Sequence, residues 1–242
     1  LSLLILGVLA AGGWALRGLA KKENPVPVLA ESVVVEEVEV TEVQMPRVPE
    51  APGTPASASA GVFDKIAAEV SGVYQRAAPS VVRIRATDGG EQLAGTGFFV
   101  DNQGTVLTAY AVLGQASEAT VEAGGRTYAA KILGRDPRSG VALLKIKAGE
   151  TPFLLLGESA GLRPASAVVS VAFPYDLKAE PTFGLVAGFD VKYLTRFFAT
   201  THIRANLPIK PGQIGGPLLD SQGKVVGVLM LEIDEGKACY AL

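Results

Sequence analysis

Short strand-like runs, apolar or alternating between apolar and polar residues, fill most of the chain after residue 80. They are Val81–Arg85, Gly95–Val100, Thr105–Ala109, Thr120–Ala123, Arg126–Leu133, Val141–Lys147, Ala167–Ala172, Pro181–Phe189, Phe197–Ile203, Pro217–Leu219 and Lys224–Leu231. A period of two residues is typical of strands, and Gly, Pro, Asn and Asp mark nearly every join between the runs. Many short strands without a second long helix predict closed β-barrels.

One helical pattern precedes the strands. Apolar residues recur at helical spacing from Val62 to Ala77, and Pro79 ends the helix. The sequence therefore predicts a short helix that leads into the first barrel.

The N-terminal residues 1–22 have a different character. Leu1–Leu16 carry no charge, and Arg17, Lys21 and Lys22 follow. The run is shorter than the roughly 20 residues that cross a bilayer, but no suitable signal-peptide cleavage site follows it closely. We interpret residues 1–22 as a transmembrane anchor, with a cleavable signal peptide as the alternative.

Residues 23–60 contain two kinds of sequence. Glu31–Gln44 alternate valine with glutamate over much of their length, which predicts a strand with an apolar and an acidic face. Such a strand is unstable alone and needs a partner from the main domain or from another chain. An extended acidic linker is the alternative. Residues 45–60 are rich in Pro, Ala and Ser and are typical of a linker.

Composition narrows the choice of function. The net charge of −2 and the lack of a basic stripe argue against a nucleic-acid partner. A single cysteine, Cys239, excludes an internal disulfide, and a single histidine, His202, excludes most zinc hydrolase sites. We expect neither a metal nor another cofactor.

Four stretches carry a family resemblance. The turn Pro211–Asp220, read as Pro-Gly-Gln-Ile-Gly-Gly-Pro-Leu-Leu-Asp, resembles the Gly-Asn-Ser-Gly-Gly-Pro turn of the HtrA/Deg branch of the trypsin-like serine proteases. Gly95–Asp101 is similar to a strand of that family, Thr105–Leu113 to its histidine segment, and Asp136–Leu144 to its aspartate segment. The resemblance covers roughly residues 62–242.

This resemblance implies an all-β fold of two antiparallel six-stranded β-barrels of the chymotrypsin/trypsin type. The first barrel, with its leading helix, would occupy residues 61–150 and the second residues 151–242.

The resemblance also implies where a catalytic triad would lie. The family's His, Asp and Ser positions correspond to Ala111, Gly140 and Ile214, and Gly212, Gln213 and Ile214 form a vestigial oxyanion turn. Alanine, glycine and isoleucine supply no nucleophile, base or acid. We therefore expect that the chain is not an enzyme.

Four residues are candidate substitutes for the missing groups. We interpret His202 as a strand histidine facing a neighbour, Tyr110 as pointing away from the vacant position by strand alternation, Ser139 as a turn brace, and Cys239 as a small buried thiol. An active hydrolase with a rearranged site is retained as an alternative.

The function expected from these observations is that of a membrane-anchored, HtrA-like pseudoprotease. It would act as a structural scaffold or assembly subunit of a membrane-associated complex, with other protein subunits as partners and its globular domain extracytoplasmic, in the periplasm of a bacterium. A homo-oligomer is compatible with this expectation. The alternative function is a peptide-binding regulator or chaperone-like module that uses the protease cleft without cutting.

Overall fold

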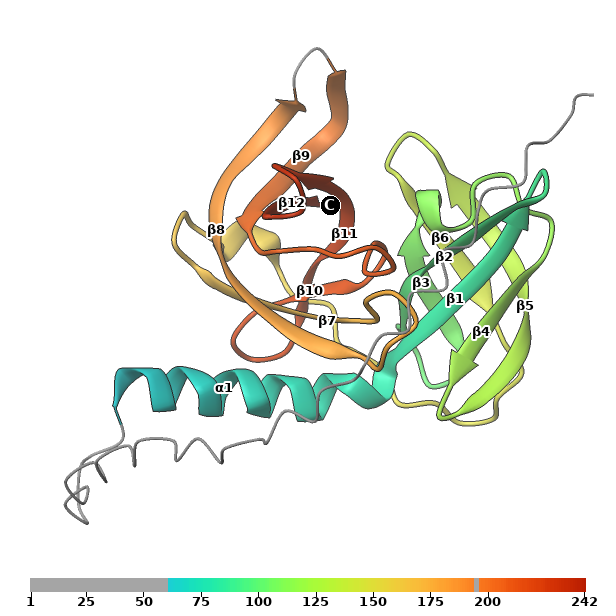
Figure 1. Ribbon diagram of the computed structural model, residues 1–242, viewed down its shortest axis with the longest axis horizontal. Helices are drawn as coiled ribbons and strands as arrows, with labels where there is room; N and C mark the ends of the chain where they lie inside the picture. Colours follow the sequence, from blue (N-terminus) through green and yellow to red (C-terminus); the bar gives the residue numbers. More distant parts are fainter. Residues whose placement is uncertain (1–60, 194–195) are drawn as a thin grey trace, which may run out of the picture. The chain divides into compact units, whose positions relative to one another are not determined.

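The computed structural model describes residues 61–193 and 196–242, and strands dominate them (Figure 1). A single α-helix, α1 (Val62–Ala77), precedes two closed antiparallel barrels of six strands each. The first barrel contains β1 (Val81–Asp88), β2 (Glu91–Phe99), β3 (Thr105–Ala109), β4 (Ala119–Ala123), β5 (Arg126–Asp136) and β6 (Val141–Lys145). The second contains β7 (Ala167–Ala172), β8 (Glu180–Tyr193), β9 (Arg196–Asn206), β10 (Pro217–Leu219), β11 (Val225–Ile233) and β12 (Ala238–Ala241).

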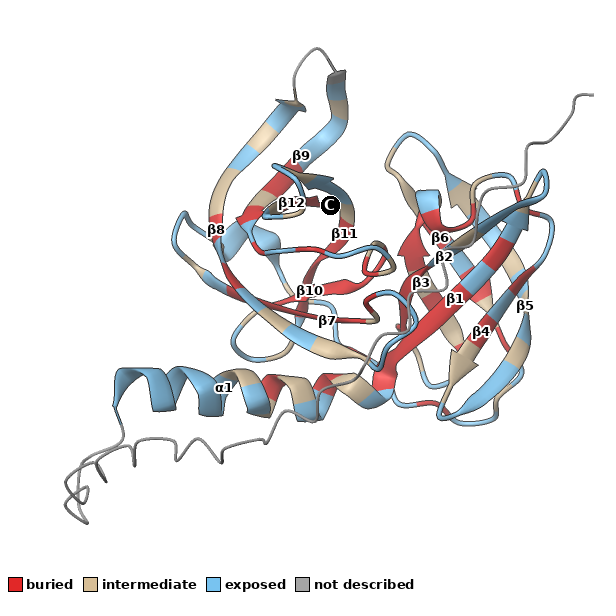
Figure 2. Cartoon of the chain, viewed as in Figure 1, coloured by how far each residue is buried: buried red, intermediate tan, exposed pale blue. Residues whose placement is uncertain are grey.

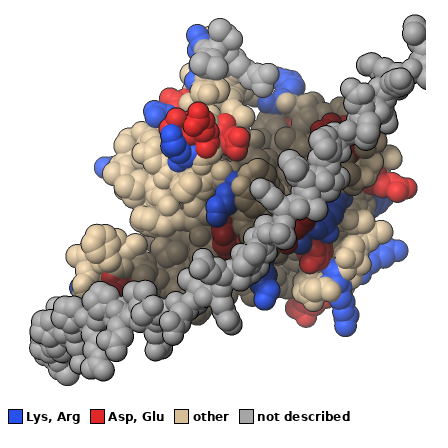
Figure 3. Space-filling model, viewed as in Figure 1, with Lys and Arg blue, Asp and Glu red and all other residues tan. Residues whose placement is uncertain are grey.

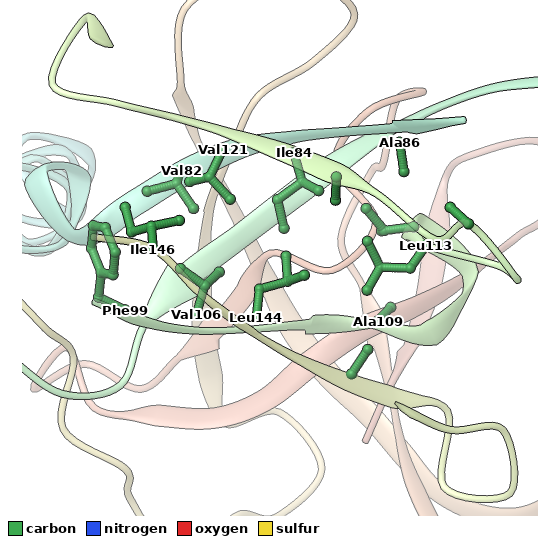
Figure 4. Close-up of a cluster of buried hydrophobic side chains, with 14 residues drawn as sticks. Val82, Ile84, Ala86, Phe99, Val106, Ala109, Leu113, Val121, Leu144 and Ile146 are labelled. Atoms are coloured by element: carbon green, nitrogen blue, oxygen red, sulfur yellow. The ribbon is translucent and has the colours of Figure 1, made fainter. Parts of the chain in front are cut away.

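Alternation along each strand fills the interior of the first barrel. Val82, Ile84 and Ala86 of β1 point inward, toward Val106 of β3 and Leu144 of β6 (Figure 4). All five are buried, and fully burying a Val, Ile or Leu side chain contributes about 1.5–3 kcal/mol. Closure also removes the free edges that an open sheet of these strands would expose.

Helix α1 rests on the second barrel by its C-terminal half. Val73 and Ala77 are buried, whereas most of the first half is exposed (Figure 2). The Tyr74 hydroxyl donates to the carbonyl of Ala179, 3.1 Å away. Pro79 lies in the 3₁₀ turn Ala78–Ser80 that follows the helix. Strand β1 begins at the next residue, Val81.

One apolar cluster joins the two barrels and the helix. Its buried members include Val73 of α1, Phe98 of β2, Val171 of β7, Leu219 of β10 and Val228 of β11. Because these side chains come from both barrels, the junction between the barrels belongs to the folded core.

Strands β8 and β9 form a long hairpin that continues past the body of the second barrel (Figure 1). The Arg204 Nε donates to the Asp190 carboxylate at 2.7 Å, and the Tyr240 hydroxyl donates to the same oxygen at 3.0 Å. This network fastens the hairpin to β12.

The predicted architecture of two six-stranded antiparallel barrels with a leading helix is confirmed. One local prediction is wrong. Residues Tyr110–Val112 form a 3₁₀ helix, so strand alternation does not set the direction of Tyr110.

The predicted anchor, residues 1–22, and the Val/Glu segment within residues 23–60 lie outside the described residues. No helix within 61–193 or 196–242 is long and apolar enough to cross a membrane.

Candidate functional site at the junction of the barrels

The turn that precedes β10 begins the site. The Gln213 N–H donates to the Lys210 carbonyl at 3.1 Å, and Gly212 adopts a φ of +92°. Residues other than glycine rarely adopt this conformation. The side chain of Gln213 is buried and folds back on the turn, where its Oε1 accepts from the Lys210 N–H at 2.7 Å. Gln213 therefore stabilises the turn that contains it.

Thr96 of β2 ties this turn to the first barrel. Its N–H donates to the Ile214 carbonyl at 2.9 Å, and its hydroxyl donates to the Gly212 carbonyl at 2.8 Å. The same hydroxyl accepts from the Phe173 N–H at 3.0 Å. Thr96 itself is completely buried.

A loop of the second barrel fixes the turn from its other side. The Tyr175 N–H donates to the Pro211 carbonyl at 2.6 Å, and a Cβ at Gly212 would lie 2.7 Å from the Phe173 carbonyl oxygen. Among the described residues, the N–H groups of Gly212 and Ile214 donate to no acceptor. The turn is thus rigidly held and keeps two free amide donors.

Ala111 and Gly140 lie next to each other. The Tyr110 N–H donates to the Gly140 carbonyl at 2.6 Å, which brings the 3₁₀ helix that contains Ala111 against the loop before β6. Ala111 is exposed, and Gly140 adopts a φ of +85°.

The methyl end of Met230 occupies the space that a side chain at position 140 would need. Met230 belongs to β11 and packs against both the core of the first barrel and the cluster between the barrels. The backbone conformation of residue 140 therefore favours glycine, and a side chain there would displace the flexible end of Met230.

Ile214 completes the junction. Its side chain is half-buried and packs against the cores of both barrels. The structure thus places Ala111, Gly140 and Ile214 around one barrel junction, together with Met230. The side chains of Ala111 and Ile214 are apolar and Gly140 has none, so these three positions offer no side-chain hydrogen-bond donor or acceptor.

His202 and Cys239 lie in the second barrel and not at this junction. The ring of His202 stacks on Phe198 with centroids 4.0 Å apart, and its Nδ1 lies 3.0 Å from the Thr200 carbonyl. Cys239 is buried in the core of the second barrel, where burial raises the pKa of its thiol to about 12. A thiol with such a pKa is not a nucleophile at neutral pH.

Ser139 braces a turn. Its hydroxyl donates to the Asp136 carboxylate at 2.6 Å, and this hydrogen bond holds the pKa of Asp136 below its ordinary value. The described residues contain no cluster of three or more His, Cys, Asp or Glu side chains that could hold a metal ion.

Two residues of the site did not emerge from the sequence. Met230 lies in a continuous apolar run, which gives no sign of its contact with Gly140. Thr96 stands between two glycines in a motif that we identified only as a strand. A small hydroxyl residue between two glycines was the one sign in the sequence that this position contacts neighbouring backbone.

Comparison with known proteins assigns the family. The model of the trypsin-like peptidase domain matches residues 95–228, more than half of the chain. The chain belongs to this family. Within it, the relatives and the fold are of the HtrA type.

The curated relatives are longer proteins. A "Probable periplasmic serine endoprotease DegP-like" from Pseudomonas fluorescens is 37% identical over 138 residues, which cover 57% of this chain and 29% of the relative. "Serine protease HTRA1" from Xenopus laevis is 38% identical over 148 residues, covering 59% and 32% respectively. The matched region thus spans about a third of either relative.

A solved structure, "HtrA-type protease AlgW with tripeptide", shares the fold. It has a TM-score of 0.66 and 25% identity, covering 72% of this chain and 59% of that one.

These comparisons correct the prediction that the chain is not an enzyme. The curated relatives are named as serine endoproteases and the structural neighbours as proteases, so the homology points to a protease. On this finding the prediction drawn from Ala111, Gly140 and Ile214 is wrong, and proteolysis is measured directly in the experiment below.

Proposed function

We propose that this HtrA-type chain is a scaffold subunit that holds other proteins in a membrane-associated assembly. In this proposal residues 1–22 anchor it and the barrels lie outside the cytoplasm. The observation that carries the proposal is the apolar packing at the barrel junction, where the partly buried Ile214 and Met230 pack against the cores of the fold. Partners would then contact the outer faces of the barrels. The names of several relatives, which describe periplasmic proteins, support the extracytoplasmic placement.

A second candidate function is the binding of an extended peptide. Strand β11 pairs with β12 as far as Ile233, but its other edge pairs with β10 only as far as Val228. The Gly215 N–H donates to the Leu229 carbonyl and the Leu229 N–H donates to the Gly216 carbonyl, which extends this pairing to Leu229. In the described part of the chain, residues 230–233 therefore present a strand edge that an added strand can pair with. The partly exposed Leu231 lies on this edge.

One experiment tests both candidates. The full chain is purified from membranes in mild detergent, and the proteins that co-purify with it are identified. Each of these proteins is then tagged, and the complex is purified through that tag to confirm the interaction and to measure the stoichiometry. Hydrogen exchange then locates the contact. Protection on the outer strands of the barrels is expected for a scaffold, and protection confined to residues 230–233 is expected for peptide capture.

Proteolysis is measured on the same preparation, with unfolded casein as substrate and a fluorophosphonate probe for a reactive serine. Cleavage that follows the chain on a sizing column and survives repurification would assign to it the protease activity named for its relatives. Failure to recover any stoichiometric partner would overturn the scaffold proposal.

A further inference from the structure

A groove crosses the outer face of the first barrel, apart from the barrel junction. It has a volume of about 1300 Å³ and is lined by residues of β1, β2, β4, β5 and β6. Lys131, Lys145 and Lys147 lie along it, together with Arg85 and one carboxylate, Glu118. We call it the lysine groove.

Small side chains form the floor of the lysine groove. Thr120 of β4 and Ala129 of β5 are direct cross-strand partners, and both are exposed. Thr127 adds to this surface from the same face of β5, since residues two apart on a strand point to the same side. Because these side chains are short, an extended peptide can lie close to the sheet there.

The three lysines of the groove lack ionic partners. Lys131 of β5 and Lys145 of β6 are direct cross-strand neighbours, and like charges directly opposite each other destabilise a sheet. Lys145 donates to the Thr105 hydroxyl at 3.0 Å, and its charge acts on the Asp101 carboxylate only from beyond ion-pair distance. In the described part of the chain, no carboxylate lies within 4.0 Å of any of the three amines. A ligand that brings carboxylates would therefore relieve this repulsion.

The other cation of the groove is already paired. Arg85 contacts the Glu122 carboxylate at 3.7 Å and the Asp176 carboxylate at 2.7 Å. Acidic and basic side chains of the described residues are likewise interspersed on the face drawn in Figure 3. The three unpaired amines of the lysine groove are thus complementary to a ligand that carries several negative charges.

The spacing of the amines favours an extended peptide as that ligand. Lys145 and Lys147 flank the buried Ile146, so their side chains leave the same face about 6.6 Å apart along the chain. Acidic side chains two residues apart in an extended peptide lie on one face with the same spacing. Two carboxylates of such a peptide can therefore meet these two amines in register.

We propose that the lysine groove binds an extended acidic segment of a partner protein, with carboxylates two residues apart paired to Lys145 and Lys147 and a further carboxylate paired to Lys131. The proposal rests on the scaffold function proposed above, because it names the chemistry of a partner held on an outer face of a barrel. The binding is salt-dependent, since exposed charge pairs are screened over about 10 Å at 0.1 M salt and over about 3 Å at 1 M.

Fluorescence anisotropy of labelled peptides tests the proposal on the purified full chain in mild detergent. The probe is Ser-Ser-Glu-Ser-Glu-Ser-Glu-Ser-Ser with blocked ends, and a first comparison peptide has glutamine in place of each glutamate. Two or three exposed ion pairs predict that the probe binds about tenfold more tightly than the glutamine peptide at low salt. We expect this difference to disappear at about 1 M salt. Equal binding of the two peptides at low salt would overturn the proposal.

A second comparison peptide tests the spacing. Ser-Glu-Ser-Ser-Glu-Ser-Ser-Glu-Ser keeps the three charges, but glutamates three residues apart point to opposite sides of an extended chain. We expect it to bind more weakly than the probe. Binding as tight as that of the probe would overturn the match in register, and tighter binding of an oligosaccharide with three sulfates would overturn the choice of a peptide.

Two matched variants locate the site. Lys131→Gln/Lys147→Gln is expected to lose most of the preference for the probe over the glutamine peptide. The control Lys65→Gln/Lys178→Gln removes the same charge from exposed sites that do not line the groove and is expected to keep the preference. Urea unfolding checks that both variants are folded. An equal preference in both variants would exclude the lysine groove as the site.

The same variants separate this proposal from the scaffold function. Each is purified from membranes beside the wild type, and the amounts of the stoichiometric partners are compared. If the partners are recovered but the probe shows no preference, the lysine groove proposal fails and the scaffold function stands. If the wild type recovers no stoichiometric partner, the scaffold function fails, and a preference for the probe that the groove variant loses still supports the lysine groove.

Discussion

At the scale of single residues, the backbone conformation at position 140 favours glycine. Gly140 has a positive φ, and the methyl end of Met230 fills the space beside it. A side chain at this φ costs up to about 1–2 kcal/mol, and displacing the flexible end of Met230 adds to this cost. We predict that Gly140→Asp lowers the free energy of unfolding by about 1 kcal/mol, measured by urea denaturation.

Two variants make this prediction specific. Gly134→Asp is the matched control, because a side chain at Gly134 meets open space. Met230→Ala clears the space beside residue 140, so Gly140→Asp should cost less in that background, leaving mainly the backbone penalty. Equal costs in both backgrounds would show that Met230 does not limit the position.

Ile214 carries the second prediction at this scale. Its side chain contacts the cores of both barrels. Each buried methylene contributes about 0.8 kcal/mol, so Ile214→Val should cost about 0.5–1.5 kcal/mol and Ile214→Ser about 2 kcal/mol or more. Thermal and urea unfolding of the two variants check this order. A serine variant as stable as the wild type would show that Ile214 is not part of the core.

At the scale of elements, the sequence predicted the strands better than their ends. Strand β8 continues to Tyr193, beyond the predicted end at Phe189. Strand β9 runs from Arg196 to Asn206, whereas the prediction was Phe197–Ile203. Asp190 and Lys192 interrupt the apolar pattern there, but long-range contacts of Asp190 with Arg204 and Tyr240 stabilise the extension. Such contacts between distant residues cannot be inferred from local alternation.

The network that fastens this hairpin has a predictable pH dependence. Hydrogen bonds from Arg204 and Tyr240 hold the pKa of Asp190 below its ordinary value of 3.8. A lowered folded-state pKa stabilises the protein above the unfolded value, and this contribution is lost as the pH falls through the folded value. The pair is partly exposed, so screening limits its contribution to about 1 kcal/mol.

We therefore predict that Asp190→Asn is less stable than the wild type at pH 7, and that the difference shrinks as the pH falls below about 3.8. Urea unfolding across this range measures it. Tyr240→Phe is the companion variant, because it keeps the pair of Asp190 with Arg204 and removes only the bond to β12. If Asp190→Asn remains less stable than the wild type by the same free energy at low pH, the charge of the Asp190 carboxylate is not the source of the difference.

At the scale of the whole molecule, the barrels and the leading helix were predictable because periodicity and family motifs agree over residues 62–242. The motifs also indicated which residues would gather at the junction, since the strands keep their order. The filling of the junction was not predictable. Glycine permits either sign of φ, so the sequence does not reveal the conformation of Gly140, and an apolar run does not show which neighbour Met230 will contact.

The two barrels share the apolar cluster between them, and the buried Thr96 hydroxyl bonds to the backbone of the second barrel. We therefore expect the barrels to unfold together. Thr96→Val keeps the shape of the side chain but leaves the Gly212 carbonyl and the Phe173 N–H without their partner. Leaving a buried polar group unpaired costs about 1–3 kcal/mol.

We predict that native-state hydrogen exchange of Thr96→Val shows an equal loss of protection at Val106 of the first barrel and Ala205 of the second. Both residues are buried in the core of their barrel, so their amides report global opening. The exposed Thr127→Val is the control and should change neither amide. If only the Val106 amide loses protection, the barrels open separately and the junction does not couple them. Equal losses would mean that a partner bound to either barrel stabilises the whole domain, as a scaffold requires.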